Sequence, residues 1–422
     1  MPMRVHLLDP QLSGQGGHYA NHDEQLIREL KRRGIGVELY GRKGAAIKVD
    51  GIDPHPVFTH DIFQEFAKDP AVWAMENFHA GNDAFMADLH SMQKDRFSST
   101  DLIYLPNLLQ NQLHAVVRWL ASMPASERPA VAVMLRYLNH AMDYVQKRAN
   151  KELIALYYRF AGRALKEIQP RSLICADTRE LAAAYHQIIG VPVLELPNPM
   201  DVAPLLARLE TKTSADEAAP VIVYQGHTSP LRGFHFLPDV INRCSRISPR
   251  PRFVIQVQNR ASAPSNGLGP ALAQLDKLAA TPGSRVRLVE GALSPDDYYA
   301  LLGQADIVLL PYAPTFYGVG SSGVFTEAAS AGKVIVVSPQ TVPARQGTEY
   351  GLGVVSAAKW EPAAMVDAVQ NAVSNLAMLR EKAQKGAVRF RTEQCAEALW
   401  KKVFGALAEL NTTKPQSGHD EA

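Results

Sequence analysis

Residues 306–339, DIVLLPYAPTFYGVGSSGVFTEAASAGKVIVVSP, form the stretch that decides the fold. The stretch opens with the apolar run 307–311, which is typical of a strand buried on both faces of a sheet. A loop rich in Pro, Tyr and Gly follows, and serines then lead into a short run of helix-forming residues that Gly332 ends. The apolar run 334–337 predicts the next strand. Strand, loop, helix and strand in this order predict one unit of a parallel α/β sheet.

The junction between this loop and the helix has the composition of a phosphate site. A Gly-rich loop that runs into a helix N-terminus leaves several backbone N–H groups unpaired and aimed at one point. The candidate substrate-binding residues here are Ser321, Ser322, Gly323 and Val324. Glu327, one turn into the helix, is placed to accept hydrogen bonds from a diol such as a ribose. An ordinary βα junction, with Glu327 on the surface, is the alternative.

Composition limits the class of protein. The chain has 422 residues, which is enough for two or three domains with cores of their own. Its 44 Lys and Arg residues nearly balance 42 Asp and Glu, and a net charge of +2 gives no support to nucleic-acid binding. The three cysteines lack metal-ligand spacing, so we expect no metal site and the reduced thiols of a cytoplasmic protein. The first apolar run is too short for a signal peptide, and no window approaches the about 18 apolar residues of a membrane span.

The order of apolar runs predicts an α/β protein with two Rossmann-like halves. Short strand-like runs alternate with helical runs along the chain, which argues for parallel sheets with helices on both faces. The polar residues before Pro220 fit a linker. We therefore expect an N-terminal domain over 1–200, a linker over 201–220, a C-terminal domain over 221–390, a last helix over 391–410 that crosses back to the first domain, and a disordered tail over 411–422.

Ligands of open α/β sheets bind beyond the carboxyl ends of the strands. Four loops that follow predicted strands lie at 9–17, 225–233, 290–294 and 312–323. If the two halves face each other, these loops converge on one interdomain cleft.

A nicotinamide cofactor is the first candidate ligand. Gly14, Gly16 and Gly17 follow a strand, but Tyr19 stands where the third glycine of GxGxxG belongs. The acidic ribose ligand expected after the second strand is replaced by Gly-Arg-Lys at 41–43. NAD is therefore disfavoured, whereas NADP is not strictly excluded by these basic residues. The sequence lacks a Walker A lysine pattern, which excludes a P-loop NTPase.

Over residues 4–400 the chain resembles the retaining GT-B glycosyltransferases of glycosyltransferase family 4. The matching motifs are the loop with Gly16 and Gly17, LELPNPMDV at 194–202, GHTSPLRG at 226–233, GALS at 291–294 followed by YYALL at 298–302, and EAASAGKVI at 327–335. The last two motifs, in the correct order and spacing, are the most specific. The resemblance implies a GT-B fold, in which the first domain takes the acceptor and the second takes a nucleotide-diphosphate sugar.

The resemblance gives His227 and Arg232 the positions of the family's basic pair, which neutralises the diphosphate leaving group. Charge grows on that group in the transition state, so fixed cations there accelerate transfer. Arg232 is expected to bind phosphate through two N–H groups. His227 replaces an arginine, and a neutral imidazole donates only one hydrogen bond, so its contact should be weaker or depend on pH. A solvated arginine and an ordinary loop histidine are the alternatives.

Glu327 matches the second glutamate of the family's E-x7-E motif, which usually grips the nucleotide ribose. The position of the first glutamate holds Val319, so either recognition of the donor sugar differs here or catalysis is impaired. The neighbouring serines and glycine offer hydroxyl and N–H groups instead. Tyr317 adds a surface on which a base or a sugar can stack, unless it simply packs.

In the first domain, Arg136 stands where the family often has a histidine beside the reacting sugar. With Arg232 and Glu327, it is one of the three candidate catalytic residues, and it is expected to contact the donor sugar or its phosphate. Gly16 and Gly17 form the family's glycine-rich loop, and His18 with Asn107 is expected to line the acceptor side.

These observations favour a hexosyltransferase-type glycosyltransferase that moves a sugar from a nucleotide-diphosphate sugar to a hydroxyl with retention, in glycan or polysaccharide biosynthesis. No cofactor or metal is required beyond the donor. The acceptor stays open among a glycan, a lipid-linked compound and a small molecule, as do a peripheral contact with the inner face of a membrane and the oligomeric state. Two alternatives remain: a catalytically impaired GT-B protein that only binds nucleotide sugars, and a GT-B epimerase, for which acid/base groups are lacking.

Overall fold

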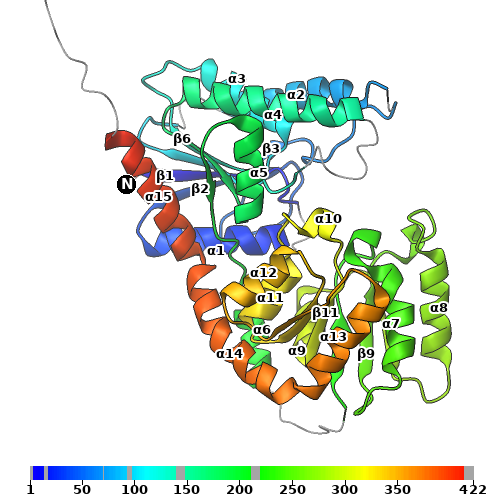
Figure 1. Cartoon of the computed structure of the whole chain (residues 1–422). Helices are drawn as coiled ribbons and strands as arrows, with labels where there is room; N and C mark the ends of the chain where they lie inside the picture. Colours follow the sequence, from blue (N-terminus) through cyan, green and yellow to red (C-terminus); the bar gives the residue numbers. More distant parts are fainter. Residues whose placement is uncertain are drawn as a thin grey trace, which may run out of the picture. The chain divides into compact units, whose positions relative to one another are not determined.

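The chain forms two compact units, each built around its own parallel sheet (Figure 1). A computed structural model of the protein describes residues 3–13, 18–69, 71–92, 97–138, 148–210 and 219–412. Unit 1 consists of Met1–Pro199 together with Gln394–Ala422, and unit 2 consists of Met200–Glu393.

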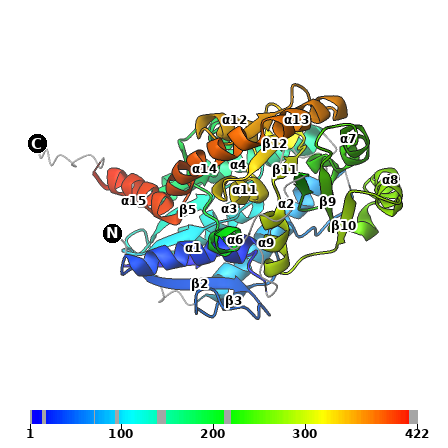
Figure 2. The same cartoon turned by 90° about the horizontal axis from the view of Figure 1, so that it is seen from below.

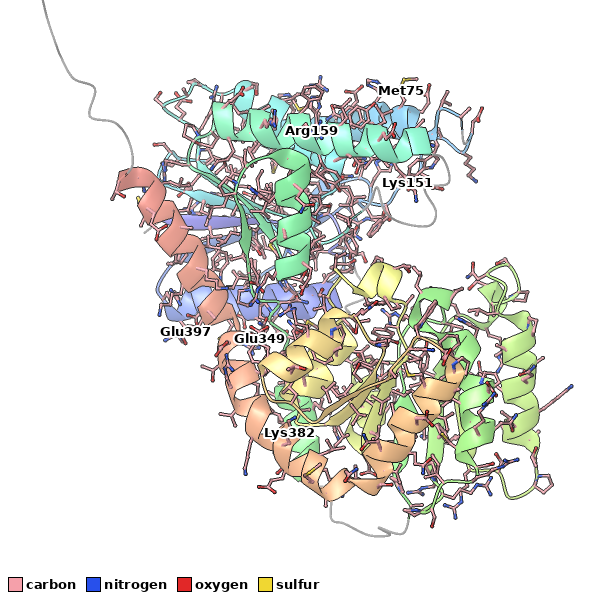
Figure 3. The ribbon with its side chains drawn as sticks, in the orientation of Figure 1. Met75, Lys151, Arg159, Glu349, Lys382 and Glu397 are labelled. Atoms are coloured by element: carbon pink, nitrogen blue, oxygen red, sulfur yellow. The ribbon has the colours of Figure 1, made fainter. Side chains whose placement is uncertain are left out.

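Unit 1 contains a seven-stranded parallel sheet in the order β3-β2-β1-β4-β5-β6-β7. Its strands are β1 (Arg4–Leu8), β2 (Gly36–Arg42), β3 (His55–Phe58), β4 (Leu102–Leu105), β5 (Ala130–Met134), β6 (Ser172–Ala176) and β7 (Val193–Glu195). Its first five helices are α1 (His18–Arg32), α2 (Trp73–Ser91), α3 (Gln110–Ala121), α4 (Arg148–Ile168) and α5 (Arg179–Ile189). The central strands β4 and β5 are buried at every position, which explains their continuous apolar sequences. Helices α2, α3 and α4 pack against one another, and Met75 of α2 is exposed (Figure 3).

The last helix of the chain completes the core of unit 1. In α15 (Ala396–Thr412), apolar residues recur at helical spacing, and the buried members of this stripe are Ala396, Leu399, Trp400, Val403 and Leu407. The indole Nε1 of Trp400 donates a hydrogen bond to the carbonyl of Leu26 in α1 at 3.1 Å. The same ring meets Tyr104 of β4 edge-on, with centroids 5.2 Å apart. Residues from both ends of the chain therefore share one core.

Unit 2 contains a six-stranded parallel sheet in the order β10-β9-β8-β11-β12-β13. Its strands are β8 (Val221–Tyr224), β9 (Arg252–Val257), β10 (Val286–Glu290), β11 (Ile307–Leu310), β12 (Val334–Val337) and β13 (Val354–Ser356). Its helices are α6 (Ala203–Glu210), α7 (Leu237–Cys244), α8 (Gly269–Ala280), α9 (Pro295–Gln304), α10 (Pro314–Tyr317), α11 (Gly323–Ser330), α12 (Val342–Glu349), α13 (Pro362–Ser374) and α14 (Leu376–Glu393). The strand order reverses direction between β8 and β11, and such a switch point is where open α/β sheets bind ligands.

Strand β11 is buried on both faces, as its apolar sequence predicts. Ile307 and Leu309 belong to the core under α7, α8 and α13, whereas Val308 and Leu310 belong to the core under α9 and α11. Helix α6 joins the second core and lies beside α9 (Figure 2). The predicted strands at 307–311 and 334–337 are confirmed within one residue, and the helix predicted between them, before Gly332, is confirmed as α11.

Two segments differ from the expected organisation. The segment 201–220, expected to be a linker, begins with helix α6, because residues 203–210 are mostly helix formers and Leu205 is fully buried in unit 2. Residues 211–218 lie outside the described part of the chain. The loop after β11 contains one turn of helix, α10, which begins at Pro314. The final helix continues to Thr412, and the predicted tail beyond it also lies outside the described residues.

The described ranges hold neither a membrane-spanning helix nor a metal cluster. None of their helices combines the length and the apolar character needed to cross a bilayer. Within the same ranges, no three His, Cys, Asp or Glu side chains are grouped so that they could hold a metal ion.

Candidate functional site

The carboxyl ends of β8 and β11 define the candidate site of unit 2. The two strands are adjacent and parallel, with Ile307 beside Ile222 in the register. The loop 225–233 follows β8, and the loop that leads to α11 follows β11, so both emerge at one edge of the sheet. The strands that precede Arg232 and Glu327 are thus neighbours.

Gly233 lets the two loops lie in direct contact. Its φ of +67° is in the left-handed region, and a Cβ added there would come within 2.0 Å of the Pro311 carbonyl oxygen. The backbone N–H of Ala313 donates to the carbonyl of Leu231 at 2.8 Å. Both contacts hold the short helix η3 (Pro230–Arg232) against the loop after β11. The position of Arg232 is therefore set by backbone packing.

Arg232 is a half-buried cation that has no carboxylate partner among the residues the structure describes. Its Nε donates a hydrogen bond to the Tyr317 hydroxyl at 3.1 Å, and its guanidinium carbon lies 5.8 Å from the centroid of the Tyr312 ring. A phenol is neutral, so it orients the guanidinium without cancelling its charge. The charge and the remaining N–H groups of Arg232 are available for an anion, and the bidentate geometry of arginine suits phosphate.

The structure corrects the role expected for Tyr317. Its side chain is buried, with 5% exposure, and its ring stacks on Tyr312 with centroids 4.1 Å apart. A ring packed in this way offers no open face to a base or a sugar. Tyr317 is instead a positioning residue, because its hydroxyl accepts the hydrogen bond from Arg232.

Replacing Tyr317 by phenylalanine is expected to weaken the binding of a nucleoside diphosphate by about 0.5–1.5 kcal/mol, because the ring still stacks while Arg232 loses its anchor. Titration calorimetry of the wild type and the variant measures the change. The control is Tyr350→Phe, which removes the hydroxyl of a buried tyrosine elsewhere in unit 2 and should leave the affinity unchanged. Equal losses in the two variants would contradict the role given to Tyr317.

The start of α11 offers backbone donors, while the Ser322 hydroxyl is used within the protein. The Ser322 Oγ caps the helix by accepting a hydrogen bond from the Phe325 N–H at 3.2 Å, and it lies 3.4 Å from the Tyr312 hydroxyl. The N–H groups of Gly323 and Val324 have no acceptor in the described part of the chain. The free N–H groups at the start of a helix attract an anion. Ser322 thus shapes the site, while Gly323 and Val324 present their backbone to it.

Glu327 is buried in α11, with 4% exposure, so its placement on the surface is excluded. The Tyr298 hydroxyl donates a hydrogen bond to its Oε2. Removal from water raises the pKa of Glu327 to about 7, and the bond from Tyr298 opposes this rise. Its Oε1 has no hydrogen bond to the described residues and can take a ligand hydroxyl. Tyr298 lies in a motif of the sequence, but its contact with Glu327 joins positions 29 apart.

The raised pKa of Glu327 predicts how stability depends on pH. In the folded protein the carboxyl keeps its proton up to about pH 7, whereas in the unfolded chain it ionises near its ordinary value of 4.5. Stability is therefore lost as pH rises between these values, by about 1 kcal/mol per pH unit. We expect Glu327→Gln to remove this loss, so the variant gains thermal stability relative to the wild type from about pH 5 to about pH 8. Parallel melting profiles for the two proteins would contradict the prediction.

His227 lies beside Arg232 and is only partly removed from solvent. Gly226, with a φ of +112°, leaves room for the Arg232 guanidinium, because a Cβ there would come within 2.1 Å of Nη1. Asn259 Nδ2 lies 3.1 Å from His227 Nδ1, and since the amide N–H donates, the neutral ring carries its proton on Nε2. Partial burial, with the charge of Arg232, lowers the pKa of His227. This favours the neutral ring and the single hydrogen bond expected of His227.

Arg136 is held by several hydrogen bonds inside unit 1. Its Nε donates to the Pro106 carbonyl at 2.9 Å, and its Nη1 donates to Asp177 Oδ2 at 3.0 Å and to Asn198 Oδ1 at 2.9 Å. Its Nη2 lies 2.7 Å from His22 Nε2. Most of the five N–H donors of a guanidinium are thus used inside unit 1, and the charge is paired with a buried carboxylate. Arg136 ties together the ends of neighbouring strands, and its contact with the donor sugar or phosphate stays a prediction.

Asn107 lies in a buried acidic cluster. Its Nδ2 is 3.4 Å from Asp9 Oδ1, which also accepts a hydrogen bond from the Gln11 N–H at 2.8 Å. Burial raises the pKa of Asp9 to about 6, and burial together with the neighbouring Asp9 raises the pKa of Asp23 well above its usual range. Asn107 is only 2% exposed, so its place on the acceptor side stays a prediction.

The glycine-rich loop stays a prediction as well. Gly16 and Gly17 lie outside the described residues, and so does the side chain of His18, whose backbone begins α1. The cleft between the two halves also stays a prediction.

Comparison with known proteins shows the fold. No family model and no curated protein matches the sequence. Sucrose-phosphate synthase from Thermosynechococcus elongatus matches with a TM-score of 0.66 and 15% identity, over 97% of this chain and 100% of that chain. The catalytic domain of starch synthase IV from Arabidopsis thaliana, bound to ADP and acarbose, matches with a TM-score of 0.67 and 10% identity, over 97% and 100%. HepE from Anabaena, in complex with UDP and glucose, matches with a TM-score of 0.57 and 14% identity, over 98% and 100%. The chain thus has the GT-B fold, with two Rossmann-like parallel-sheet domains.

Proposed function

We propose that the protein is a glycosyltransferase that moves a sugar from a nucleotide-diphosphate sugar to a hydroxyl. The observation that carries the proposal is Arg232, an oriented cation without a carboxylate partner among the described residues, at the switch point of the sheet in unit 2. Val324 lies close to it, because an added Cβ at Gly226 would be within 3.6 Å of Val324 and 2.1 Å of Arg232. Solved structures of the same fold hold UDP with glucose and ADP with acarbose, which supports a nucleotide-sugar donor.

Each group of this site has a role in the proposed reaction. Arg232 and the N–H groups of Gly323 and Val324 hold the diphosphate, whose negative charge grows as the bond to the sugar breaks. His227 adds one hydrogen bond through Nε2. Glu327 accepts hydrogen bonds from the ribose hydroxyls, and Tyr298 orients its carboxyl.

The finer features belong to the same proposal. The protein is a member of glycosyltransferase family 4 that transfers a hexose with retention at the anomeric carbon. It acts in the cytoplasm in glycan or polysaccharide biosynthesis, and it requires no cofactor beyond the donor. The motif resemblance supports them.

Binding of nucleotide sugars without transfer is the second candidate function. Val319 replaces the first glutamate of the E-x7-E motif, and His227 replaces an arginine, so both changes fall on groups that contact the donor. Arg232, Glu327 and the start of α11 remain, and they suffice for binding a nucleoside diphosphate.

Titration calorimetry with UDP, ADP and GDP tests the proposal, followed by hydrolysis assays with the glucose or mannose derivative of the nucleotide that binds. We expect one nucleoside diphosphate to bind and its sugar derivative to be hydrolysed slowly in the absence of an acceptor. Binding with neither hydrolysis nor transfer across an acceptor panel would favour the second candidate. If none of the three nucleotides binds, both candidates are wrong.

A further inference from the structure

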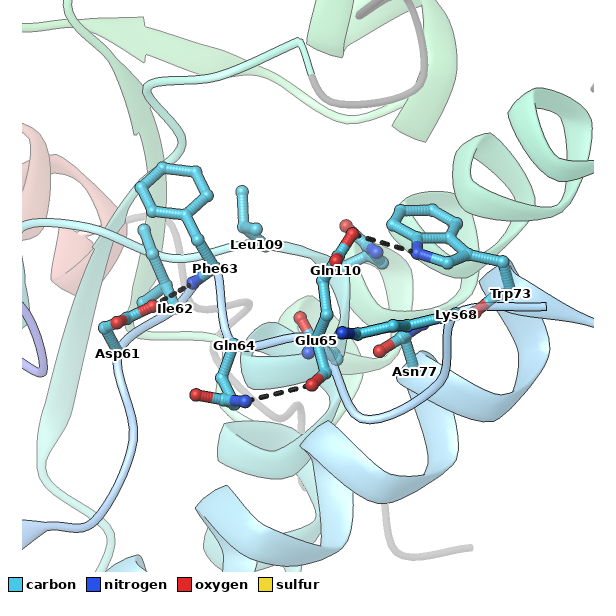
Figure 4. Close-up of a pocket in the computed structure, with 11 residues that line it drawn as sticks. Asp61, Ile62, Phe63, Gln64, Glu65, Lys68, Trp73, Asn77, Leu109 and Gln110 are labelled. Carbon is cyan, nitrogen blue, oxygen red and sulfur yellow. Dashed lines mark hydrogen bonds between the residues drawn. The ribbon is translucent and has the colours of Figure 1, made fainter. Parts of the chain in front are cut away.

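Unit 1 contains a pocket of about 510 Å³ that the proposed donor site does not use (Figure 4). The loop between β3 and α2 and the start of α3 form its walls. The lining residues that matter below are Phe63, Glu65, Trp73, Gln110 and Asn111. Phe63 meets the ring of Tyr137 edge-on, with centroids 5.0 Å apart, and Tyr137 follows β5. The pocket therefore lies at the carboxyl edge of the sheet, where α/β domains bind ligands.

The aromatic wall of the pocket is held in place. The indole Nε1 of Trp73 donates a hydrogen bond to Glu65 Oε1 at 3.1 Å. Asn77 accepts from the Ala67 N–H at 3.2 Å and donates to the carbonyls of Ala67 at 2.9 Å and Trp73 at 2.8 Å. These bonds tie the loop to the first turn of α2. A wall that is ordered before binding reduces the entropy lost when a ligand binds.

Asn111 places an unsatisfied amide in the pocket wall. It is 5% exposed, and its Oδ1 has no hydrogen-bond partner among the described residues. Leaving such a group unpaired costs about 1–3 kcal/mol. Gly81 makes the space for this side chain, because a Cβ there would come within 2.2 Å of Asn111 Nδ2. Oδ1 has almost no exposed surface in this arrangement, so a ligand hydroxyl recovers the lost hydrogen bond only when the Asn111 side chain turns Oδ1 toward the pocket.

The charges around the pocket do not suit an anion. The ionisable lining residues are Asp61, Glu65 and Lys68. Lys68 is the one cation among these lining residues. The two acids have partners: Asp61 Oδ2 lies 3.7 Å from Arg42 Nη1, and Glu65 accepts the hydrogen bond of the Trp73 indole. A site for a phosphate or carboxylate ligand typically contains several cations or an arginine that binds through two N–H groups. The chemistry of the pocket is that of an uncharged, hydroxyl-rich ligand.

We propose that this pocket binds an uncharged sugar ring of the acceptor. A sugar ring has an apolar face of C–H groups, which fits against an aromatic face such as that of Trp73. Its hydroxyls both donate and accept, as the amides of Gln110 and Asn111 do. In Figure 4, Phe63 and Trp73 stand at opposite sides of the lining, with Leu109 and Gln110 between them. The inference rests on the proposed function, and it selects a glycan among the three acceptor classes.

The test uses maltose, cellobiose, lactose, mannobiose and chitobiose as probes, with binding to the full chain followed by saturation-transfer NMR and calorimetry. We expect at least one disaccharide to bind the wild type and to lose about tenfold or more in affinity in Trp73→Ala. Gly81→Ala, whose added Cβ would come within 2.2 Å of Asn111 Nδ2 and displace that amide, should weaken binding of the same sugar without replacing a lining residue. The control is Met75→Ala on the same helix, which is 43% exposed and outside the lining and should bind as the wild type does. Melting temperatures show whether each variant is folded.

Two results would overturn the inference: none of the five disaccharides binds, or one binds equally well to the wild type and to both folded variants. Titration of the same proteins with UDP, ADP and GDP separates this failure from that of the proposed function. Nucleotide binding without sugar binding removes only the acceptor pocket. Sugar binding that needs Trp73, without any nucleotide binding, leaves a sugar site in unit 1 but overturns both the glycosyltransferase and the acceptor role of the pocket.

Discussion

Deletion of Gln394–Ala422 is expected to unfold unit 1 and to yield a protein that aggregates. The deletion removes the buried stripe of α15 and uncovers the strand residues packed beneath it. Truncating one large buried side chain costs about 2–5 kcal/mol, and losing several at once exceeds the 5–15 kcal/mol by which a domain is stable. Solubility on expression and thermal unfolding measure the effect. A control deletion of 413–422 leaves α15 intact and should melt as the full chain does.

A single substitution tests the same packing without removing the helix. Trp400→Ala should lower the stability of unit 1 by about 3–5 kcal/mol, because the side chain is fully buried and its Nε1 is bonded to Leu26. Lys401→Ala is the matched control, because Lys401 follows Trp400 in the same helix and is exposed. A soluble protein ending at residue 393 that melts like the full chain would contradict the packing of α15 in this core.

Replacing Arg232 by alanine is expected to weaken nucleoside diphosphate binding by about 1.5–3 kcal/mol, or about 10- to 150-fold, because a charge-assisted contact to phosphate is lost. The affinity of Arg232→Lys should fall between those of the wild type and Arg232→Ala, since lysine keeps the charge but loses the bidentate geometry. Titration calorimetry measures all three proteins.

The matched control for Arg232 is Arg243→Ala. Arg243 is an exposed arginine of the same unit that is paired with Asp239 on α7, and its loss should leave the affinity unchanged. If Arg232→Ala binds nucleotide as tightly as the wild type, Arg232 is not a phosphate ligand.

The fold could be predicted because its signals are local. The run 307–311 is apolar at every position since helices cover both of its faces, and this pattern is visible without any partner strand. Strand β3 was not predicted, because it has only four residues and includes Pro56. The sequence places helix α6 in a linker because it adjoins a polar segment, and its burial depends on α9, which lies about 90 residues further along the chain.

The candidate site could be predicted only in part, because side-chain partners are distant in sequence. Arg232 and Glu327 stand in motifs that follow strands, so the sequence locates them. Tyr317 looks equally suited to stacking or packing until its bond to Arg232, 85 positions away, is known. Arg136 occupies a position next to a strand end, but its bonds to Asp177 and Asn198, 41 and 62 positions away, are not visible in the sequence. Trp73 and Asn111 share a pocket although no motif links them.

The packing of α15 has a consequence for how the chain is made. The ribosome synthesises the sheet of unit 1 first, then all of unit 2, and only then the helix that covers part of that sheet. At about 5–20 residues per second, roughly 10–40 s pass while unit 2 is translated. During this time the nascent unit 1 carries an uncovered apolar face. Unit 2 therefore completes its core before unit 1 does, and the uncovered face of the nascent unit 1 is a surface for aggregation until α15 has been made.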